Sequence, residues 1–339
     1  MSVISPTPYG GGEYGMIESE HRFGGQMNAV DAAIDNGVLF KVHSMPIEIN
    51  GQIPEVKSGK YKGEPERKVL YRQDNDWEDP MILNVVPPQH PESNHQQWIE
   101  TVEAAFPNSC TAMRSLDNGK RFMAIFELGD VYNIASPDYP DWLQSNLLIG
   151  GSLDGTWPTF MSSFVGRLFC SNQCTAENTK IKLRRTTNHD QILLDRSLVL
   201  AKAGEHAEMF NRMASAMRRI PFSEAQYKSF LRTFLPEPTA PEGEEVSTRT
   251  MNAWEEKMKA VTYYWQVEDE GPGAGTAWAA WNAIQSAETH DFTRSSSTDL
   301  QIRKQVDQIR DNDTPVSYTH LRAHETREDL VWRLLLEKK

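Results

Sequence analysis

The sequence predicts an α+β protein, with a mostly antiparallel twisted sheet in its N-terminal half and a helical C-terminal half packed against that sheet. Short apolar runs separated by turn residues dominate the chain before Asn188. Two of these runs flank Asp117-Asn118-Gly119, a tripeptide typical of a tight hairpin turn. After Asn188 the apolar side chains recur with helical spacing. The chain therefore changes character near this residue.

The N-terminal half reads as short strands with two short helices. Residues 1–25 are rich in Gly and Pro, and we expect an extended arm there. Apolar spacing predicts helices over Asn28–Val38 and Gln96–Phe106. Strands are predicted over Phe40–Ile49, Lys68–Arg72, Met81–Val86, Cys110–Ser115, Arg121–Leu128, Leu143–Gly150 and Thr159–Cys170. Because Arg121–Leu128 is apolar at consecutive positions, we expect both faces of this strand to be covered.

The C-terminal half has the periodicity of amphipathic helices. Helices are predicted over Asp190–Ile220, Glu224–Phe234, Thr248–Tyr264 and Thr276–Ala287. The acidic, Pro-rich segment 236–247 is expected to be a linker. The domain organisation that follows is an N-terminal arm at 1–25, a strand-rich core at 26–188, a helical region at 189–292 and a divergent end at 293–314.

The last residues, 315–339, differ from the rest of the chain. They read PVSYTHLRAHETREDLVWRLLLEKK and resemble a translated adapter or vector sequence that recurs on unrelated reading frames. On this interpretation the natural protein ends near Thr314, and an amphipathic helix is the alternative. His320 and His324 have the spacing of a metal-binding helix but lack a third ligand, so no metal site is predicted.

Composition limits the classes of function. The formal net charge of −12 argues against affinity of the whole protein for nucleic acid or anionic membranes, although it allows a local basic site. No apolar run reaches the roughly 18 residues of a membrane span, and the first residues do not form a secretory signal. Three cysteines in a chain of 339 residues favour reduced thiols and a cytoplasmic location. Glycine-rich phosphate-binding motifs are absent from the sequence, and no cofactor is predicted.

A basic segment lies where the strands give way to helices. Between Asp154 and Phe222 the surplus of basic over acidic residues is 10 − 6 = 4. The ten cations are Arg167, Lys180, Lys182, Arg184, Arg185, Arg196, Lys202, Arg212, Arg218 and Arg219, and the six acids are Asp154, Glu177, Asp190, Asp195, Glu205 and Glu208. The candidate nucleic-acid contacts are Arg121, Arg167, Lys180, Lys182, Arg184 and Arg185. On a strand, Lys180, Lys182 and Arg184 would share a face that could follow a phosphate backbone. A solvated edge strand protected by charge is the alternative.

A second group of residues, most of them polar and uncharged, are candidates for catalysis. The candidate catalytic residues are Asp154, Cys170, Asn172, Asn282 and His290. In the last predicted helix Asn282, Ser286 and His290 recur every four residues, and Trp278 shares that side. These groups could form a recognition site, or they could lock the helix against the sheet through buried hydrogen bonds.

Two sequence patterns resemble those of a known family. SLDG at 152–155, followed by RLFCSN at 167–172, is similar to its S-x-D-G and R-x-x-C-x-N motifs. Gly275-Thr276, Trp278, Asn282-Ala283 and His290 are similar to its motif G-T-x-W-x-x-x-N-A followed by H. This is the phage/plasmid-like protein family, domain of unknown function 932, and the similarity runs from about Gly25 to Phe292. The chain departs from the family at Ser286-Ala287, where an acidic-aromatic pair is usual, and over Val86–His95.

The resemblance implies a context of phage, plasmid and related mobile DNA in a bacterial host cell, without an established activity. Three functions follow as hypotheses. The first is an accessory protein of DNA metabolism that binds single-stranded nucleic acid, similar to annealing recombination proteins, works as a homo-oligomer and needs no cofactor or membrane. The second is an enzyme whose five polar candidates share one pocket. The third is a protein that binds a host protein in counter-defence.

Overall fold

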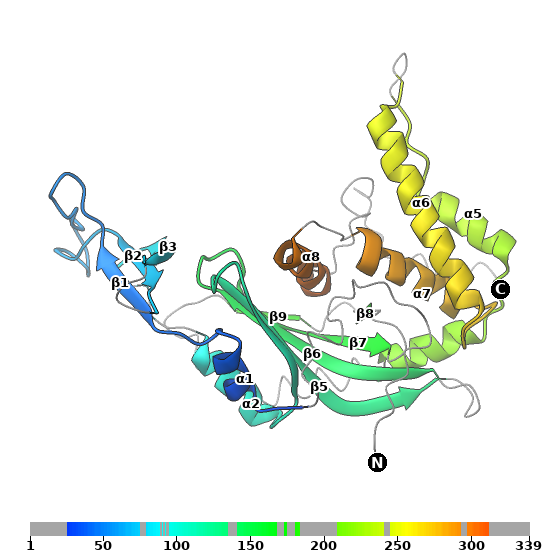
Figure 1. Ribbon diagram of the computed structural model, residues 1–339, viewed down its shortest axis with the longest axis horizontal. Helices are drawn as coiled ribbons and strands as arrows, with labels where there is room; N and C mark the ends of the chain where they lie inside the picture. The colour runs from blue at the N-terminus through cyan, green and yellow to red at the C-terminus, as the bar shows by residue number, and fades with distance from the viewer. Residues whose placement is uncertain are drawn as a thin grey trace.

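The computed structural model describes residues 26–74, 79–88, 90, 92, 95–134, 141–167, 173–174, 180–183, 209–240, 245–292 and 297–311. Within these residues the first half forms two antiparallel sheets and the second half is helical (Figure 1). The predicted α+β class is therefore confirmed, with two sheets where the sequence suggested one.

The first sheet is small and has three antiparallel strands in the order β1-β2-β3. These are β1 (Val42–Pro46), β2 (Lys68–Arg72) and β3 (Met81–Val86). The bounds of β2 and β3 are those predicted. Its packed face carries Leu70 and Leu83, which lie in one apolar cluster with Leu153, the residue directly after strand β6 (Trp142–Ser152) of the second sheet. We call these three strands the small sheet; it lies at one end of the molecule in Figure 1.

The second sheet has six strands in the order β4-β5-β6-β7-β8, with β9 also paired to β7. The strands are β4 (Cys110–Leu116), β5 (Arg121–Asn133), β6 (Trp142–Ser152), β7 (Thr159–Arg167), β8 (Gln173–Cys174) and β9 (Lys180–Leu183). The predicted turn between β4 and β5 is confirmed, because Asp117, Asn118 and Gly119 have φ of 50°, 57° and 90°. Such left-handed backbone favours Asn, Asp and Gly. We call this the large sheet.

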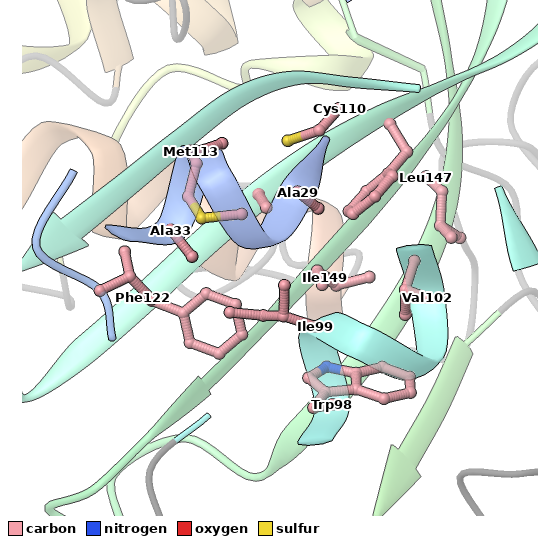
Figure 2. Packing of buried hydrophobic residues seen from close by; sticks show 14 of the residues in the cluster. Ala29, Ala33, Trp98, Ile99, Val102, Cys110, Met113, Phe122, Leu147 and Ile149 are labelled. Atoms are coloured by element: carbon pink, nitrogen blue, oxygen red, sulfur yellow. The ribbon is translucent and has the colours of Figure 1, made fainter. Parts of the chain in front are cut away.

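Two helices cover one face of the large sheet. They are α1 (Ala29–Asp35) and α2 (Gln96–Ala105) (Figure 2). Ala29 and Ala33 of α1 pack with Ile99 of α2 and with Leu147 and Ile149 of β6. Small side chains on α1 allow it to lie close to the sheet, which brings the larger side chains of both layers into contact.

The buried carboxylate of Glu103 fixes the start of α1 against α2. It accepts hydrogen bonds from the backbone N–H of Ala29 at 2.8 Å, from Asn28 Nδ2 at 2.9 Å and from the backbone N–H of Asn108 at 2.8 Å. Three donors offset the cost of burying the carboxylate, and one of them is an N–H at the helix N-terminus that has no partner within its helix.

The opposite face of the large sheet is covered by α8 (Thr298–Asp311). Ile302 and Val306, four residues apart on this helix, pack with Ile125, Leu148 and Phe160 of the sheet. The prediction that the strand beginning at Arg121 is covered on both faces is thus confirmed. No helix or strand was predicted over 293–314. The helix that covers this face, α8, lies within that segment.

The other C-terminal helices pack on one another beside the sheet. A helix spans 209–218, followed by α5 (Glu224–Phe234), α6 (Thr248–Asp269), α7 (Ala277–Ala287) and the π-helical turn η1 (Glu288–Phe292). Between α5 and α6, the rings of Tyr227 and Trp265 stack at 4.2 Å, and the Tyr227 hydroxyl donates to the Val261 carbonyl at 3.0 Å. No helix in the described part of the chain is both long and apolar enough to cross a membrane.

Two adjacent glycines in β6 test how tightly the large sheet is packed. A Cβ at Gly150 would lie 2.7 Å from the Phe160 ring and 2.8 Å from the Phe122 backbone oxygen, whereas a Cβ at Gly151 would meet its nearest atom at 3.4 Å. Gly150→Ala should therefore lower the free energy of unfolding by about 1–3 kcal/mol through overpacking. Gly151→Ala is the matched control, expected to change it by less than about 1 kcal/mol. Urea unfolding measures both, and equal losses would contradict the packing described.

Candidate functional site

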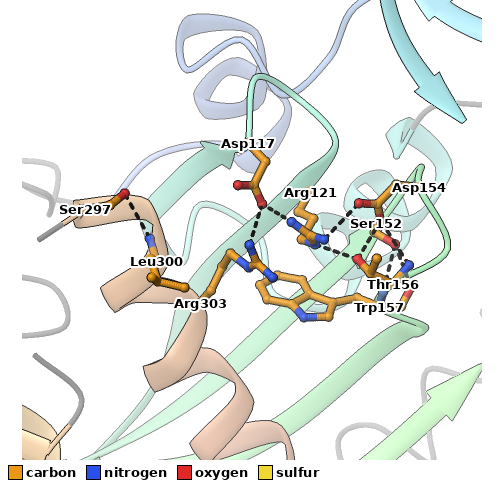
Figure 3. A network of polar contacts seen from close by, with 9 residues as sticks. All are labelled: Asp117, Arg121, Ser152, Asp154, Thr156, Trp157, Ser297, Leu300 and Arg303. Carbon is orange, nitrogen blue, oxygen red and sulfur yellow. Dashed lines mark hydrogen bonds and ion pairs between the residues drawn. The ribbon is translucent and has the colours of Figure 1, made fainter. Parts of the chain in front are cut away.

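Arg121 joins the two turns at one end of the large sheet. Its Nη2 lies 2.9 Å from Asp154 Oδ2, its Nε donates to Thr156 Oγ1 at 2.6 Å, and its Nη1 pairs with Asp117 (Figure 3). Asp117 belongs to the β4–β5 turn, and Asp154 and Thr156 belong to the β6–β7 turn. Asp154 Oδ1 also accepts from the backbone N–H of Thr156 at 3.0 Å and from its hydroxyl at 2.6 Å. One guanidinium therefore holds both turns.

This network is largely removed from solvent. The side chain of Arg121 is 7% exposed and that of Asp154 is 15% exposed. Burial lowers the pKa of Arg121, and the nearby Asp154 carboxylate opposes that shift. An arginine keeps its charge through shifts of this kind. Since its donors are already bonded to Asp117, Asp154 and Thr156, Arg121 is not displayed as an open contact for phosphate.

Two arginines of α8, Arg303 and Arg310, contact residues at the same end of the large sheet. Arg303 Nη1 lies 3.4 Å from Asp117 Oδ2 (Figure 3), and the Arg310 guanidinium lies 5.6 Å from the centre of the Trp157 ring. Arg121 lies 5.8 Å from the centre of the same ring. Cation–π and ion-pair contacts thus supplement the apolar packing of α8. The SLDG motif region holds the sheet and this helix together.

The second motif region lies at the other end of β6. Asp141, which directly precedes β6, is fully buried and accepts from Trp278 Nε1 at 2.8 Å. Arg218 Nη1 lies 3.5 Å from the same carboxylate oxygen. Asn282 is also fully buried and donates to the backbone carbonyl of Trp278 at 2.8 Å. The bond from Trp278 to Asp141 ties α7 to the residue before β6, whereas the Asn282 bond stays within α7.

The structure does not bring Asp154 and Asn282 together. Asp154 follows β6, whereas Asn282 lies one helical turn from Trp278, whose indole reaches the residue before β6. A strand of 11 residues extends over about 35 Å. The shared pocket that the enzyme hypothesis requires is not formed by this pair.

The other candidates of this group fall elsewhere. Cys170 and Asn172 lie outside the described residues, and only the backbone of His290, in η1, is described. Cys110 is buried, and burial raises the pKa of its thiol to about 12, which disfavours the thiolate form. Among the described residues, no group of three His, Cys, Asp or Glu side chains could hold a metal ion.

The first two cations of the basic row, Lys180 and Lys182, lie on the strand β9. Lys180 is in register with Ser162 of β7, and Lys182 is in register with Phe160. Arg167 ends β7, and Arg184 and Arg185 lie outside the described residues. Nucleic-acid binding by these cations stays a prediction.

One face of the small sheet is a second candidate surface. It was not predicted from the sequence. Strand pairing aligns two rows of side chains across it: His43 with Tyr71 and Ile82, and Met45 with Val69 and Val85. We call these six side chains the open face. Met45, Ile82 and Val85 are 52%, 58% and 47% exposed, and the rings of His43 and Tyr71 stack at 5.3 Å with an interplanar angle of 20°. Neighbouring exposed apolar side chains make this face a candidate interaction surface.

A β-bulge creates the open face. Ile82 and Val85 are three residues apart, so strict alternation would place them on opposite faces. The pairing of β2 with β3 shifts register between Leu70 and Tyr71, which leaves Leu83 as an extra residue in β3. Leu83 is 3% exposed and packs inward. The bulge returns Ile82 and Val85 to one side, which a pattern of period two could not reveal.

The cations at packed-face positions of the small sheet form ion pairs with carboxylates. Lys68 and Arg72, at positions that alternate with Leu70, are paired with Glu92 at 2.9 Å and Asp74 at 2.6 Å. Hydrogen bonds from Ser44 and Lys68 lower the pKa of Glu92, and the bond from Arg72 lowers that of Asp74. The cations at packed-face positions are therefore neutralised.

Lys41 and Arg67 occupy alternate positions at the two ends of the open face. The backbone carbonyl of Arg67 accepts a hydrogen bond from the backbone N–H of Ile47 at 3.1 Å, which continues the register of β1 and β2 by one step beyond Pro46. Both cations are exposed, and neither forms an ion pair with any residue that the structure describes. The same holds for Lys57, Lys60 and Lys62 in the loop between β1 and β2.

The Arg121 network predicts a large loss of stability when its cation is removed. Arg121→Gln leaves the carboxylates of Asp117 and Asp154 partly buried beside a neutral group, so the free energy of unfolding should fall by about 3–5 kcal/mol. Lys259→Gln, on an exposed side chain, is the control and should stay within about 0.5 kcal/mol. Chemical denaturation measures both. A loss as small as that of the control would show that the network contributes nothing, and a double-mutant cycle with Asp154→Asn isolates the pair.

The sequence profile of a domain of unknown function, DUF932, matches residues 94–313. No curated protein and no solved structure matches the chain. The matched range holds the large sheet, the Arg121 network and α5 to α8; it begins after the small sheet and ends before 315–339, whose adapter interpretation stays a prediction. Since the match covers more than half of the chain and confirms the resemblance seen in the motifs, the chain belongs to the DUF932 family.

Proposed function

We propose that this protein binds single-stranded nucleic acid as an accessory factor of DNA metabolism. The observation that carries the proposal is the positive charge of the segment from Lys41 to Arg72. This segment has seven Lys and Arg residues and four Glu residues, so its net charge is 7 − 4 = +3, whereas the whole chain has a net charge of −12. The seven cations are Lys41, Lys57, Lys60, Lys62, Arg67, Lys68 and Arg72. Five of them are exposed and form no ion pair with a described residue. Concentrated, uncompensated positive charge is what a phosphate backbone requires.

The acidic remainder of the chain favours a single strand over a duplex. A duplex carries one charge per about 1.7 Å of its axis, twice the density of one strand. It therefore meets stronger repulsion from a body of negative net charge. The resemblance to phage- and plasmid-associated proteins also supports a role in exchange or repair of mobile DNA.

The two other hypotheses have no comparable support. The enzyme hypothesis depends on the convergence of polar groups, and Asp154 and Asn282 lie near opposite ends of β6. The acidic composition is compatible with a host-protein partner, but no described surface selects one.

Fluorescence anisotropy with a labelled oligothymidine tests the proposal on the full chain. We expect binding at low salt, with the logarithm of the affinity falling linearly with the logarithm of salt concentration. Changing Lys57, Lys60 and Lys62 together to Gln should weaken binding about tenfold at low salt and reduce the salt slope by about 2, since each phosphate contact to a single strand contributes about 0.7.

The control replaces Lys228, Lys259 and Lys304, which are exposed cations of the helical half, by Gln. This variant loses the same charge and should bind like the parent protein. Absence of binding by the parent protein at low salt would refute the proposed function.

The cations in and after β9 are the alternative site for the phosphate contacts. In the variant Lys182→Ala, Arg184→Ala, Arg185→Ala, we expect a smaller loss of affinity than in the Lys57, Lys60, Lys62 variant, because the latter set is exposed and has no described ion pair. The reverse order, measured by the same anisotropy titration, would place the phosphate contacts on the β9 side.

A further inference from the structure

We propose that the open face of the small sheet is the platform on which unpaired bases stack, an inference that rests on the proposed function and adds the location and mode of binding. The face consists of His43, Met45, Val69, Tyr71, Ile82 and Val85. It lies before the range that the family profile matches, residues 94–313.

The spacing of the rows suits a short run of nucleotides. Alternate residues on an antiparallel strand are about 7 Å apart, so Lys41, the two rows and Arg67 extend over about 20 Å. Sheets of other proteins that bind single strands stack two or three bases on aromatic side chains over a surface of this kind. The open face thus has room for a few bases between two terminal cations.

The stacked rings of His43 and Tyr71 give the platform its affinity for bases. Both residues are partly exposed, and their rings stand in an offset stack of 5.3 Å. A base can extend such a stack, since every base has a π face. Met45, Ile82 and Val85 present the apolar surface beside the rings. Bases inside a duplex are already stacked and paired, so this contact selects unpaired bases.

Charge identifies the occupant as nucleic acid rather than a second copy of the chain. On the packed-face side, Lys68 and Arg72 are neutralised by carboxylates, whereas Lys41 and Arg67 at the ends of the open face are exposed. A row of apolar and aromatic groups between two uncompensated cations complements a strand of bases joined by phosphates. A second copy placed on this face would bring the same exposed cations, Lys41 and Arg67, against one another, whereas a phosphate backbone carries the opposite charge.

The test separates stacking from charge. Tyr71→Ala combined with His43→Ala should weaken binding to oligothymidine about tenfold or more, and should leave the salt slope unchanged because no phosphate contact is lost. Tyr71→Phe should bind like the parent protein. Tyr263→Ala, which removes an aromatic side chain that is 56% exposed on α6, is the matched control and should have no effect.

Two further measurements guard against loss of folding. Tyr71→Leu with His43→Leu keeps the apolar bulk of the face while removing the rings, and should lose affinity with an unchanged circular dichroism spectrum and melting temperature. Photo-cross-linking of a bromodeoxyuridine oligonucleotide to the unmodified protein, followed by mass spectrometry, should attach the strand to His43 or Tyr71.

Several outcomes would overturn the platform. If the Ala and Leu double variants bind with parental affinity while the Lys57, Lys60, Lys62 variant is weakened, the platform is wrong and the proposed function stands. Equal affinity for duplex and single strand would also refute base stacking. If sedimentation without nucleic acid shows a dimer that dissociates on Ile82→Asp, the face is an interface between copies. If the parent protein binds no oligonucleotide at low salt, the proposed function itself fails.

Discussion

The buried guanidinium of Arg121 is the interaction on which the arrangement of the described parts depends. It pairs with Asp117 in one turn of the large sheet and with Asp154 in the next, and so fixes the end of β4 to β7. Asp117 in turn contacts Arg303 of α8. Because a partly buried charge without partners is strongly unfavourable, removal of any one of these groups destabilises the others. The same groups hold the sheet and the helix that covers one face of it.

The position of the small sheet follows from the same turns. The backbone N–H of Leu153 donates to the Lys120 carbonyl at 2.7 Å, and Asn84 Nδ2 of β3 donates to the Leu153 carbonyl at 2.9 Å. The side chain of Leu153 lies in the apolar core of the small sheet. The Arg121 network is therefore a scaffold, and it places the open face without taking part in it. This division explains why the residues with the most buried polar contacts are poor candidates for contacting a ligand.

Polar residues in the two family motifs have structural partners where they are described. Asp154 is bonded to Arg121 and Thr156, and Asn282 caps a carbonyl within its own helix. A buried polar group needs such partners to offset its desolvation. Motif residues of this kind preserve a fold, and a ligand-binding role belongs more naturally to exposed groups such as Lys41 and Arg67 and to the partly exposed ring of Tyr71.

The sequence by itself determined the local structure. Period-two and helical patterns located the strands and helices, and the Asp117-Asn118-Gly119 turn was predictable because left-handed backbone favours those residue types. Both signals depend only on residues near one another in the chain. The part of α6 beyond Tyr264 and the helix α8 were not predicted, and both pack on distant segments: Trp265 stacks on Tyr227, and Ile302 and Val306 pack on the large sheet.

Only the tertiary structure decided the partners of Arg121 and the composition of the open face. Arg121 and Asp154 are 33 positions apart in the sequence, and no local pattern says that they meet. The open face depends on the pairing of three strands and on the bulge at Leu83, which reverses the alternation expected for Ile82 and Val85. A one-residue change of register moves a side chain from one face to the other, so the surface is set when the strands assemble.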